Sequence, residues 1–246
     1  FGDAAARLAR DPGFIRAISN RVVSAGSGTG ATPAAGAAEG RGAPAATGQP
    51  LRLLPSGALG GPILGNMNRI RRATVVVSFS GHGSGFLIDR RGYILTNAHV
   101  VGDAERVRVK LFQGKAVIGR VVRRDAARDV ALVKIAPPGR AALPLRRLRA
   151  RVGETVLAVG APNNQQLEAT VSRGIVSGIR RSGGLIYIQA DATVHPGSSG
   201  GPLVDRSGNV VGLTVAVLTD RRGRAAAGLN LFIPIGDALK RLNLRY

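Results

Sequence analysis

Two adjacent serines, Ser198 and Ser199, stand inside a run of glycines at residues 197–201 (GSSGG). Glycines permit a tight turn that exposes a serine hydroxyl, and the successive backbone N–H groups of such a turn can converge on one point, as an oxyanion-binding site requires. A serine hydroxyl is a poor nucleophile unless a neighbouring base takes its proton. The run therefore indicates nucleophilic catalysis only if the chain also supplies a base.

Three histidines could act as this base: His82, His99 and His195. His82 lies in a glycine-rich loop, where polar surface is the simpler interpretation, and His195 comes four residues before Ser199. His99 ends an apolar stretch, where a purely structural histidine is the alternative. Asp129 begins a stretch that is otherwise nearly all apolar, and a carboxylate is costly to bury there unless something binds it. A histidine N–H is the obvious partner for Asp129.

The composition excludes several other kinds of chemistry. The 246 residues include no cysteine, which excludes disulfides, thiol catalysis and cysteine-ligated zinc, and three histidines are too few for a histidine-rich metal site. We therefore expect neither a metal nor an organic cofactor. Hydrophobic residues make up 44% of the chain, enough for a folded core. No apolar run approaches the roughly 20 residues that span a bilayer.

The charge is strongly unbalanced, with 35 Lys and Arg against 14 Asp and Glu and a net charge of +21. Such a chain is attracted to polyanions, including nucleic acid and anionic lipid, through counterion release. The basic clusters are scattered along the chain and are not interleaved with aromatic residues that could stack on bases. We interpret them first as solvated surface, with incidental electrostatic binding of nucleic acid or anionic surfaces.

Composition divides the chain into three parts. Residues 1–23 form a short amphipathic segment, in which an Asp-Pro pair at 11–12 resembles a helix start. Residues 24–66 are predicted to be a linker, because much of this stretch is rich in Ala, Gly and Pro without helical or strand periodicity. Residues 67–246 form the predicted folded domain. The first residue is Phe1 rather than Met, so we expect upstream sequence, where a secretion signal would lie.

The domain contains many short segments of strand character, rich in β-branched residues and separated by glycine-containing turns. This pattern favours an antiparallel barrel or sandwich, and the spacing of Ile235, Leu239 and Leu242 predicts one helix at the end. The predicted strands are residues 74–79, 85–88, 93–95, 106–111, 116–122, 129–135, 155–159, 169–179, 185–190, 210–218 and 229–233.

Four blocks of sequence occur in a specific order: residues 83–86 (GSGF), 92–101 (GYILTNAHVV), 129–135 (DVALVKI) and 191–202 (DATVHPGSSGGP). Together they resemble the HtrA/Deg family of trypsin-like serine proteases, over roughly residues 73–242. The resemblance implies an all-β fold of two six-stranded antiparallel β-barrels of chymotrypsin type with a C-terminal helix, preceded by a flexible N-terminal extension. The order His, Asp, Ser is that of chymotrypsin-like enzymes.

The resemblance implies a role for each matching residue. Ser199 would be the nucleophile, His99 the base that later protonates the leaving amine, and Asp129 the acid that holds the imidazole tautomer. The oxyanion hole would be formed by the backbone at Gly197, Ser198 and Ser199, with the N–H groups of Gly197 and Ser199 as donors. The implied activity is that of a serine endopeptidase on unfolded or extended polypeptides, in protein quality control.

The resemblance also implies a substrate site. An extended substrate would pair as an additional strand along three consecutive residues, Val215, Ala216 and Val217. Thr193 and Thr214 would form the walls of the specificity pocket and Leu229 its floor, with no acid to pair a basic side chain. Small or medium aliphatic side chains are therefore expected before the cleaved bond.

Two features depart from the family pattern. Ser198 occupies a position where Asn is usual, and little effect is expected because the oxyanion hole uses the backbone. The chain stops at Tyr246, so the C-terminal PDZ domain common in the family is not expected, while a homotrimer of protease domains stays open. The resemblance favours the bacterial periplasm or a secreted location.

Two other functions stay open from the sequence. One is a non-catalytic binding module or chaperone of protease fold, whose loops form no active oxyanion hole. The other is a polyanion-binding protein that uses the net charge of +21. Turnover of an unfolded protein separates the first from an enzyme, and sequence or structure preference in nucleic-acid binding tests the second.

Overall fold

The computed structural model describes residues 49–54, 56–161, 168–219 and 225–246, with only the backbone described at 216–219 and 225–229. The predicted amphipathic segment at residues 1–23 lies outside this range.

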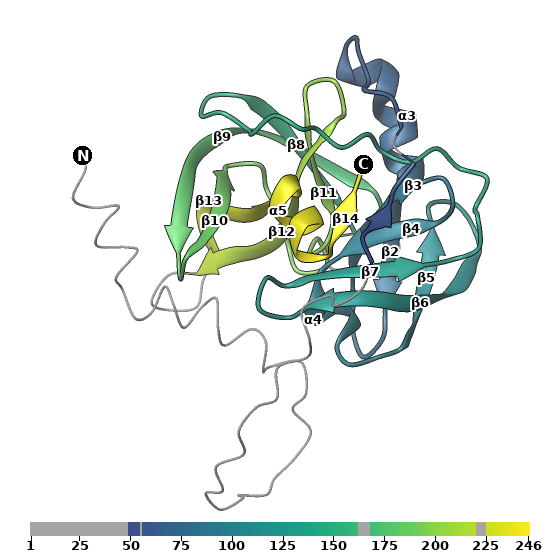
Figure 1. Ribbon diagram of the computed structural model, residues 1–246. Helices are drawn as coiled ribbons and strands as arrows, with labels where there is room; N and C mark the ends of the chain where they lie inside the picture. The colour runs from purple at the N-terminus through teal and green to yellow at the C-terminus, as the bar shows by residue number, and fades with distance from the viewer. Residues whose placement is uncertain (1–48, 55, 162–167, 220–224) are drawn as a thin grey trace, which may run out of the picture.

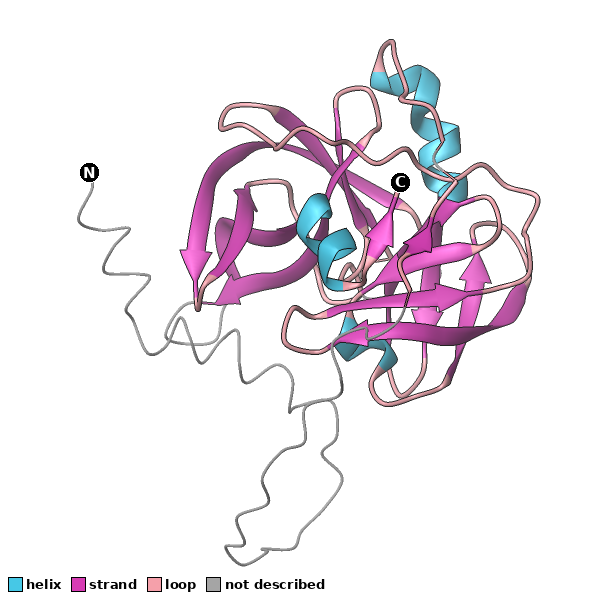
Figure 2. Cartoon of the chain, in the orientation of Figure 1, coloured by secondary structure: helices cyan, strands magenta, loops and turns pink. Residues whose placement is uncertain are grey.

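Two closed, six-stranded antiparallel barrels lie side by side (Figures 1 and 2), which confirms the predicted fold class. In the first barrel the strand order is β2-β3-β4-β7-β6-β5, and the strands are β2 (Thr74–Ser78), β3 (His82–Asp89), β4 (Tyr93–Thr96), β5 (Arg106–Leu111), β6 (Ala116–Asp125) and β7 (Val130–Lys134). In the second the order is β10-β13-β12-β11-β8-β9, and the strands are β8 (Thr155–Gly160), β9 (Thr170–Ser182), β10 (Leu185–Ala190), β11 (Pro202–Asp205), β12 (Val210–Thr219) and β13 (Ala225–Pro234).

The period-2 pattern of the sequence decides which side of each barrel wall faces the core. In β5, Val107 and Val109 are buried while Arg106 and Arg108 are exposed, because successive side chains of a strand point to opposite faces. Phe232 on β13 is fully buried in the second barrel's core. Each barrel therefore has a packed interior and holds its connecting loops in place.

Shorter elements close the ends of the barrels. These are β1 (Leu51–Arg52), α3 (Ile63–Ala73), α4 (Ala98–Val101), α5 (Ile235–Arg241) and β14 (Leu244–Arg245). The predicted terminal helix is confirmed as α5, with Ile235 and Leu239 buried and Leu242 buried just beyond it.

The structure differs from the sequence analysis before residue 67. Strand β1 pairs in parallel with β14, and Leu53 is buried. Helix α3 begins at Ile63 and buries Ile70 and Ala73. Residues 49–54 and 56–66, which the composition assigned to the linker, are therefore partly packed on the barrels. A pairing partner almost two hundred residues away leaves no local signal in the sequence.

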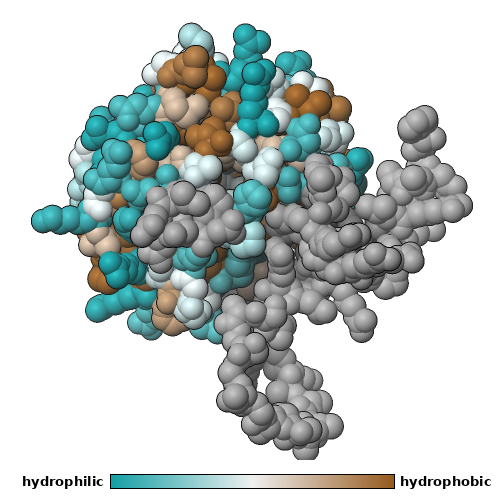
Figure 3. Space-filling model, turned by 180° about the vertical axis from the view of Figure 1, so that it is seen from behind, coloured by the Kyte–Doolittle hydropathy of each residue, from teal (hydrophilic) through white to brown (hydrophobic). Residues whose placement is uncertain are grey.

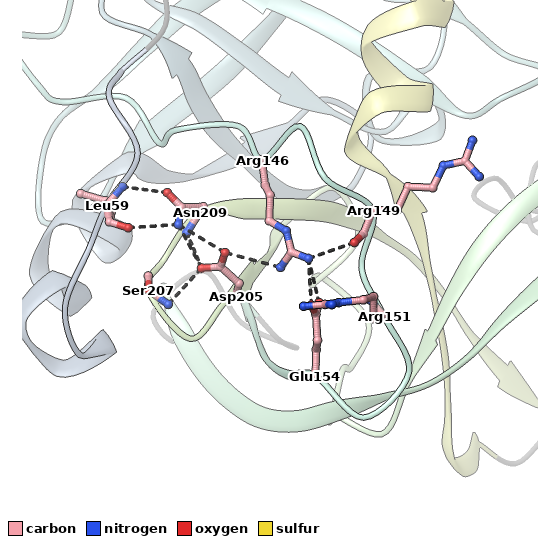
Figure 4. A network of polar contacts seen from close by, with 8 residues as sticks. All are labelled: Leu59, Arg146, Arg149, Arg151, Glu154, Asp205, Ser207 and Asn209. Atoms are coloured by element: carbon pink, nitrogen blue, oxygen red, sulfur yellow. Dashed lines mark hydrogen bonds and ion pairs between the residues drawn. The ribbon is translucent and has the colours of Figure 1, made fainter.

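A polar network ties this early segment to the second barrel (Figure 4). The Leu59 amide donates to Asn209 Oδ1 at 2.8 Å, and Asn209 in turn donates to Asp205. Arg146 lies between Asp205, at 3.6 Å, and Glu154, at 2.9 Å. Burial alone would raise the pKa of Glu154, but hydrogen bonds from Arg146 and Arg151 hold it below its ordinary value.

The sequence analysis interpreted the basic residues first as solvated surface, but two of the arginines are largely buried. The side chains of Arg128 and Arg146 are 0% and 16% exposed, and both hold carboxylates and backbone carbonyls. On the rear face, hydrophilic and hydrophobic side chains are interspersed (Figure 3). No helix within the described residues is long and apolar enough to cross a membrane.

Asp89 joins the early segment to the turn between β3 and β4. Its buried carboxylate accepts the N–H groups of Leu54 and Arg91, each at 2.7 Å, and the Arg91 guanidinium at 2.6 Å. Burial alone would raise the pKa of Asp89, but the Arg91 side chain and the two backbone N–H groups hold it below its ordinary 3.8. The ionised form is thus stabilised in the folded state.

Asp89→Asn is expected to lower the free energy of unfolding by about 1–3 kcal/mol at pH 7, since it weakens charge-assisted hydrogen bonds to a buried group. A depressed folded-state pKa contributes stability above the unfolded value, and that stability is lost as the pH falls through the folded value. The difference from wild type in urea unfolding should therefore shrink below about pH 4. Asp103→Asn, at a fully exposed carboxylate, is the control and should change little. A pH-independent effect of Asp89→Asn would contradict the assignment.

Candidate active site

His99 is carried by the single helical turn α4, which follows β4 of the first barrel. Val100 and Val101 on this turn are buried and anchor it to the barrel. The His99 side chain is 31% exposed, so one edge of the ring is open to solvent while its backbone is held. A partly open imidazole on a fixed turn suits a group that must exchange protons with a bound molecule.

Asp129 receives two hydrogen bonds from His99. The His99 backbone N–H donates to Asp129 Oδ1 at 2.9 Å, and the ring Nδ1 lies 2.8 Å from Oδ2. An ionised carboxylate only accepts hydrogen bonds, so Nδ1 carries the proton and Nε2 is left as the basic nitrogen. The structure thus brings together the histidine and acid that the sequence analysis paired.

The backbone of Asp129 is held in an uncommon conformation. Its φ of +63° lies in the left-handed region, which aspartate tolerates better than most residues. The buried Asn97 side chain donates to the Asp129 carbonyl at 2.8 Å. Asn97 immediately precedes α4, so the carboxylate and the imidazole are positioned by a shared set of contacts.

The serine turn, defined as residues 195–201, consists of two consecutive β-turns. In the first, the Ser198 amide donates to the His195 carbonyl at 2.9 Å, with Gly197 at a φ of +93°. In the second, the Gly201 amide donates to the Ser198 carbonyl at 3.0 Å, with Gly200 at +83°. A positive φ at the third position only is the signature of a type II turn.

The serine turn packs directly against the first barrel through Ser84 of β3. The Ser84 amide donates to the Ser199 carbonyl at 2.7 Å, and the Ser84 hydroxyl donates to the Gly197 carbonyl at 2.8 Å. The Ser84 carbonyl accepts the hydroxyl of Thr96, three residues before His99, at 2.7 Å. Ser84 therefore connects the serine turn to the first barrel, and Thr96 links Ser84 to the strand that leads to His99.

Glycines make this approach possible. A Cβ added at Gly200 would clash with the Ser84 carbonyl and lie 3.1 Å from the Asn97 nitrogen. A Cβ at Gly83 would lie 2.5 Å from a methyl of Val100 and 3.0 Å from the Ser199 carbonyl oxygen. Gly200 is thus packed against the residues that precede His99, and Gly83 lies between Val100 and the Ser199 carbonyl.

The two serines have different environments. Ser198 is 7% exposed, and its hydroxyl accepts the His195 amide at 3.3 Å. Ser199 is only partly buried, and its hydroxyl donates to the carbonyl of Val215 in a long 3.4 Å contact. Val215 sits where the pairing of β12 with β13 shifts register, a bulge that turns its carbonyl towards the serine turn. Of these two serines, Ser199 is therefore the less buried.

The amides of Gly197 and Ser199 face no acceptor within the described part of the chain, while the three neighbouring amides at Ser198, Gly200 and Gly201 are all paired. Buried backbone N–H groups are almost always hydrogen-bonded. Gly197 and Ser199 are both half-buried, so these two N–H groups are available to an acceptor from outside the described residues.

The other predicted site residues are only partly brought together. Thr193 lines a cavity of about 80 Å³ beside Ser172 and His195. Thr214 is buried on β12 and does not line this cavity, although its carbonyl accepts the Gly200 amide at 2.9 Å. The side chains of Ala216, Val217 and Leu229 lie outside the described residues.

Three positioning residues were missed by the sequence analysis: Ser84, Thr96 and Asn97. All three lie in blocks that carried the family resemblance, and all are 0% exposed. The available signal was a polar side chain among glycines or at the end of an apolar strand. The contacts of Asn97 and Ser84 reach residues 32 and 113 positions away, and that of Thr96 reaches a neighbouring strand 12 positions away, which spacing cannot reveal.

Comparison with known proteins gives a consistent result. Residues 83–213 match the family described as a trypsin-like peptidase domain. A putative serine protease named HhoA from Synechocystis is 42% identical over 171 residues, covering 65% of this chain and 41% of the relative. A probable periplasmic serine endoprotease, DegP-like, from Ectopseudomonas mendocina is 39% identical over 166 residues, covering 64% of this chain and 34% of the relative.

Solved structures agree with the sequence comparison. An HtrA-type protease, AlgW with a tripeptide, superposes with a TM-score of 0.65 at 31% identity, covering 73% of this chain and 62% of that one. The chain spans less than half the length of the two curated relatives named above.

Gly200→Ala should damage the site out of proportion to the size of the change. A left-handed alanine alone costs about 1–2 kcal/mol, and the clash with the Ser84 carbonyl adds about 1–3 kcal/mol. Gly153→Ala is the matched control, because Gly153 has a φ of +88° and nothing within 4 Å of an added Cβ. Urea unfolding should show a loss about 1–3 kcal/mol larger for Gly200→Ala than for Gly153→Ala, and equal losses would contradict the packing described.

Proposed function

Because the chain belongs to the trypsin-like peptidase family and its relatives include HtrA-type proteases, we propose that it is a serine endopeptidase in which Ser199, His99 and Asp129 form the catalytic triad. The observation that carries this proposal is the double hydrogen bond from His99 to Asp129. It places the Nδ1 proton on the side of Asp129, so in the neutral imidazole Nε2 is the nitrogen left to act as a base.

In the proposed reaction, the Ser199 hydroxyl attacks the peptide carbonyl while His99 Nε2 takes its proton. The imidazolium that results is stabilised by Asp129, and His99 then donates the proton to the leaving amine. Water repeats the sequence on the acyl-enzyme and releases the acid product. The Ser199 hydroxyl donates to Val215 before substrate binds, and catalytic hydrogen bonds commonly tighten only in the substrate complex.

The free amides of Gly197 and Ser199 are proposed to bind the oxyanion of the tetrahedral intermediate. The type II turn at residues 195–198 matters for this role. A type I turn would rotate the peptide between Pro196 and Gly197 by nearly half a turn and present a carbonyl where the N–H now lies. A glycine at position 197 makes the type II form inexpensive.

The proposed substrates are unfolded or extended polypeptides. An extended segment would pair with β12 at Val215, where the bulge interrupts the regular ladder to β13. The name of one relative, a probable periplasmic serine endoprotease, supports a proposed periplasmic or secreted location. A role in protein quality control is proposed with it. The alternative function is a latent binding module of the same fold. Turnover of an unfolded protein would distinguish an enzyme from such a module.

Hydrolysis of unfolded, fluorescently labelled casein tests the triad. Ser199→Ala and His99→Ala should remove activity almost completely, and Asp129→Asn should reduce kcat by about 10⁴-fold because the imidazole loses its working tautomer. Ser198→Ala is the matched control and should retain activity within a few-fold. Activity that survives Ser199→Ala, or wild type that binds casein tightly without cleaving it, would contradict the proposal.

Cleavage is expected after small or medium aliphatic residues. Among the described residues, those that line the cavity beside Thr193 include no acid, and the Asp191 carboxylate accepts the Ile175 amide at 2.6 Å. Mass spectrometry of casein digestion products should therefore show mainly Ala, Val, Ile or Leu before the cleaved bond. Predominant cleavage after Lys or Arg would refute this specificity.

A further inference from the structure

Arg128 is the largest fully buried side chain among the described residues, and it immediately precedes Asp129. A charged side chain is costly to bury, and arginine is almost never fully buried unless it is paired. The turn between β6 and β7 that carries it belongs to the first barrel. Its guanidinium, however, extends into contacts made by other parts of the molecule.

All partners of this guanidinium lie beyond the first barrel. Nε lies 2.6 Å from Asp237 Oδ2 on α5, an ion pair without hydrogen-bond geometry, and Nη2 donates to the Ile186 carbonyl on β10. The planar group stacks over the ring of Tyr187, also on β10, at 4.5 Å from the ring centre. One side chain thus fastens the loop of Asp129 to the second barrel and to the terminal helix.

Most remaining contacts of the loop are made within the first barrel, although Asp125 at its start also lies 3.8 Å from Arg241 on α5. The Arg128 amide donates to Asp125 Oδ1 at 2.8 Å, and Asn97 holds the Asp129 carbonyl. Asp129 itself has a left-handed backbone, a conformation that persists only when its surroundings determine it. Arg128 contacts the second barrel and α5 next to Asp129, while Asn97 contacts Asp129 from within the first barrel.

We propose that Arg128 is a positioning residue for Asp129, holding the acid loop against the second barrel so that the carboxylate meets both His99 nitrogens. The expected effect of Arg128 on hydrolysis rests on the proposed function, but its effect on the geometry of Asp129 does not. The geometric consequence, loss of the fixed contact between Asp129 and His99, can be measured without catalysis.

The first test compares Arg128→Met with Arg146→Met. Arg146 is a matched control, since it is also a mostly buried arginine with carboxylate and carbonyl partners, but those partners lie away from the Asp129 loop. Arg128→Met should lower kcat for casein hydrolysis by about 10- to 100-fold, the effect of a displacement of about 1 Å in a catalytic group. Arg146→Met should change kcat less than threefold at a similar or larger loss of Tm.

The second test uses proton NMR of the Ser199→Ala protein. We expect the Nδ1 proton between His99 and Asp129 to give a low-field signal, because Nδ1 lies 2.8 Å from Oδ2. This signal should be broadened or lost when Arg128→Met is added and should persist with Arg146→Met. Arg128→Lys retains the charge near Asp237 but not the planar fork, so an intermediate signal and kcat are expected. It also keeps the test valid if Arg128→Met does not fold.

The outcomes separate the two proposals. An unchanged low-field signal and unchanged kcat in folded Arg128→Met would overturn the positioning role, even in an active protease. Equal losses of kcat in Arg128→Met and Arg146→Met would also overturn it, because they would reflect general destabilisation. A wild type with no serine-dependent hydrolysis would refute the proposed function, while the NMR comparison would still decide whether Arg128 positions Asp129.

Discussion

The candidate site depends on one constraint. The backbone of the serine turn is in direct contact with the backbone of the first barrel. Ser199 comes from the second barrel, whereas His99 and Asp129 come from the first. Side chains of ordinary size between the barrels would separate these residues. Glycines at positions 83 and 200 remove that obstacle, and the Ser84 hydrogen bonds then hold the two surfaces at a fixed distance. The reactive geometry is thus a property of the interface rather than of either barrel.

Arginine side chains act as internal hydrogen-bond donors in many parts of this molecule. The chain has far more cations than acids, so many guanidinium groups have no carboxylate to pair with. Several donate instead to backbone carbonyls of loops, including Arg69 to Ala142, Arg123 to Leu242 and Arg140 to Phe112. The rigid, multiply donating guanidinium is suited to this role. Arg128 is the most buried case and the one next to a candidate functional residue.

The sequence predicted those features that leave a local or a familiar signal. Alternation predicted strands such as residues 106–111, and the spacing of Ile235, Leu239 and Leu242 predicted the last helix. Four blocks carried the family resemblance and with it the pairing of His99 with Asp129. Strand β11 at Pro202–Asp205 was missed because a four-residue strand directly after a glycine turn has no period to detect. The roles of Leu53 and Arg128 arise from partners distant in the chain, which neither composition nor spacing indicates.

The most direct measurement is identification, by mass spectrometry, of the residue that a fluorophosphonate probe modifies. Such a probe reacts only where a serine is activated and its phosphonyl oxygen is held by oxyanion donors. The account predicts modification of Ser199 alone in the folded protein, loss of modification in His99→Ala, and no modification after unfolding in urea. Modification of Ser198, or labelling of Ser199 that is unaffected by His99→Ala, would contradict the account.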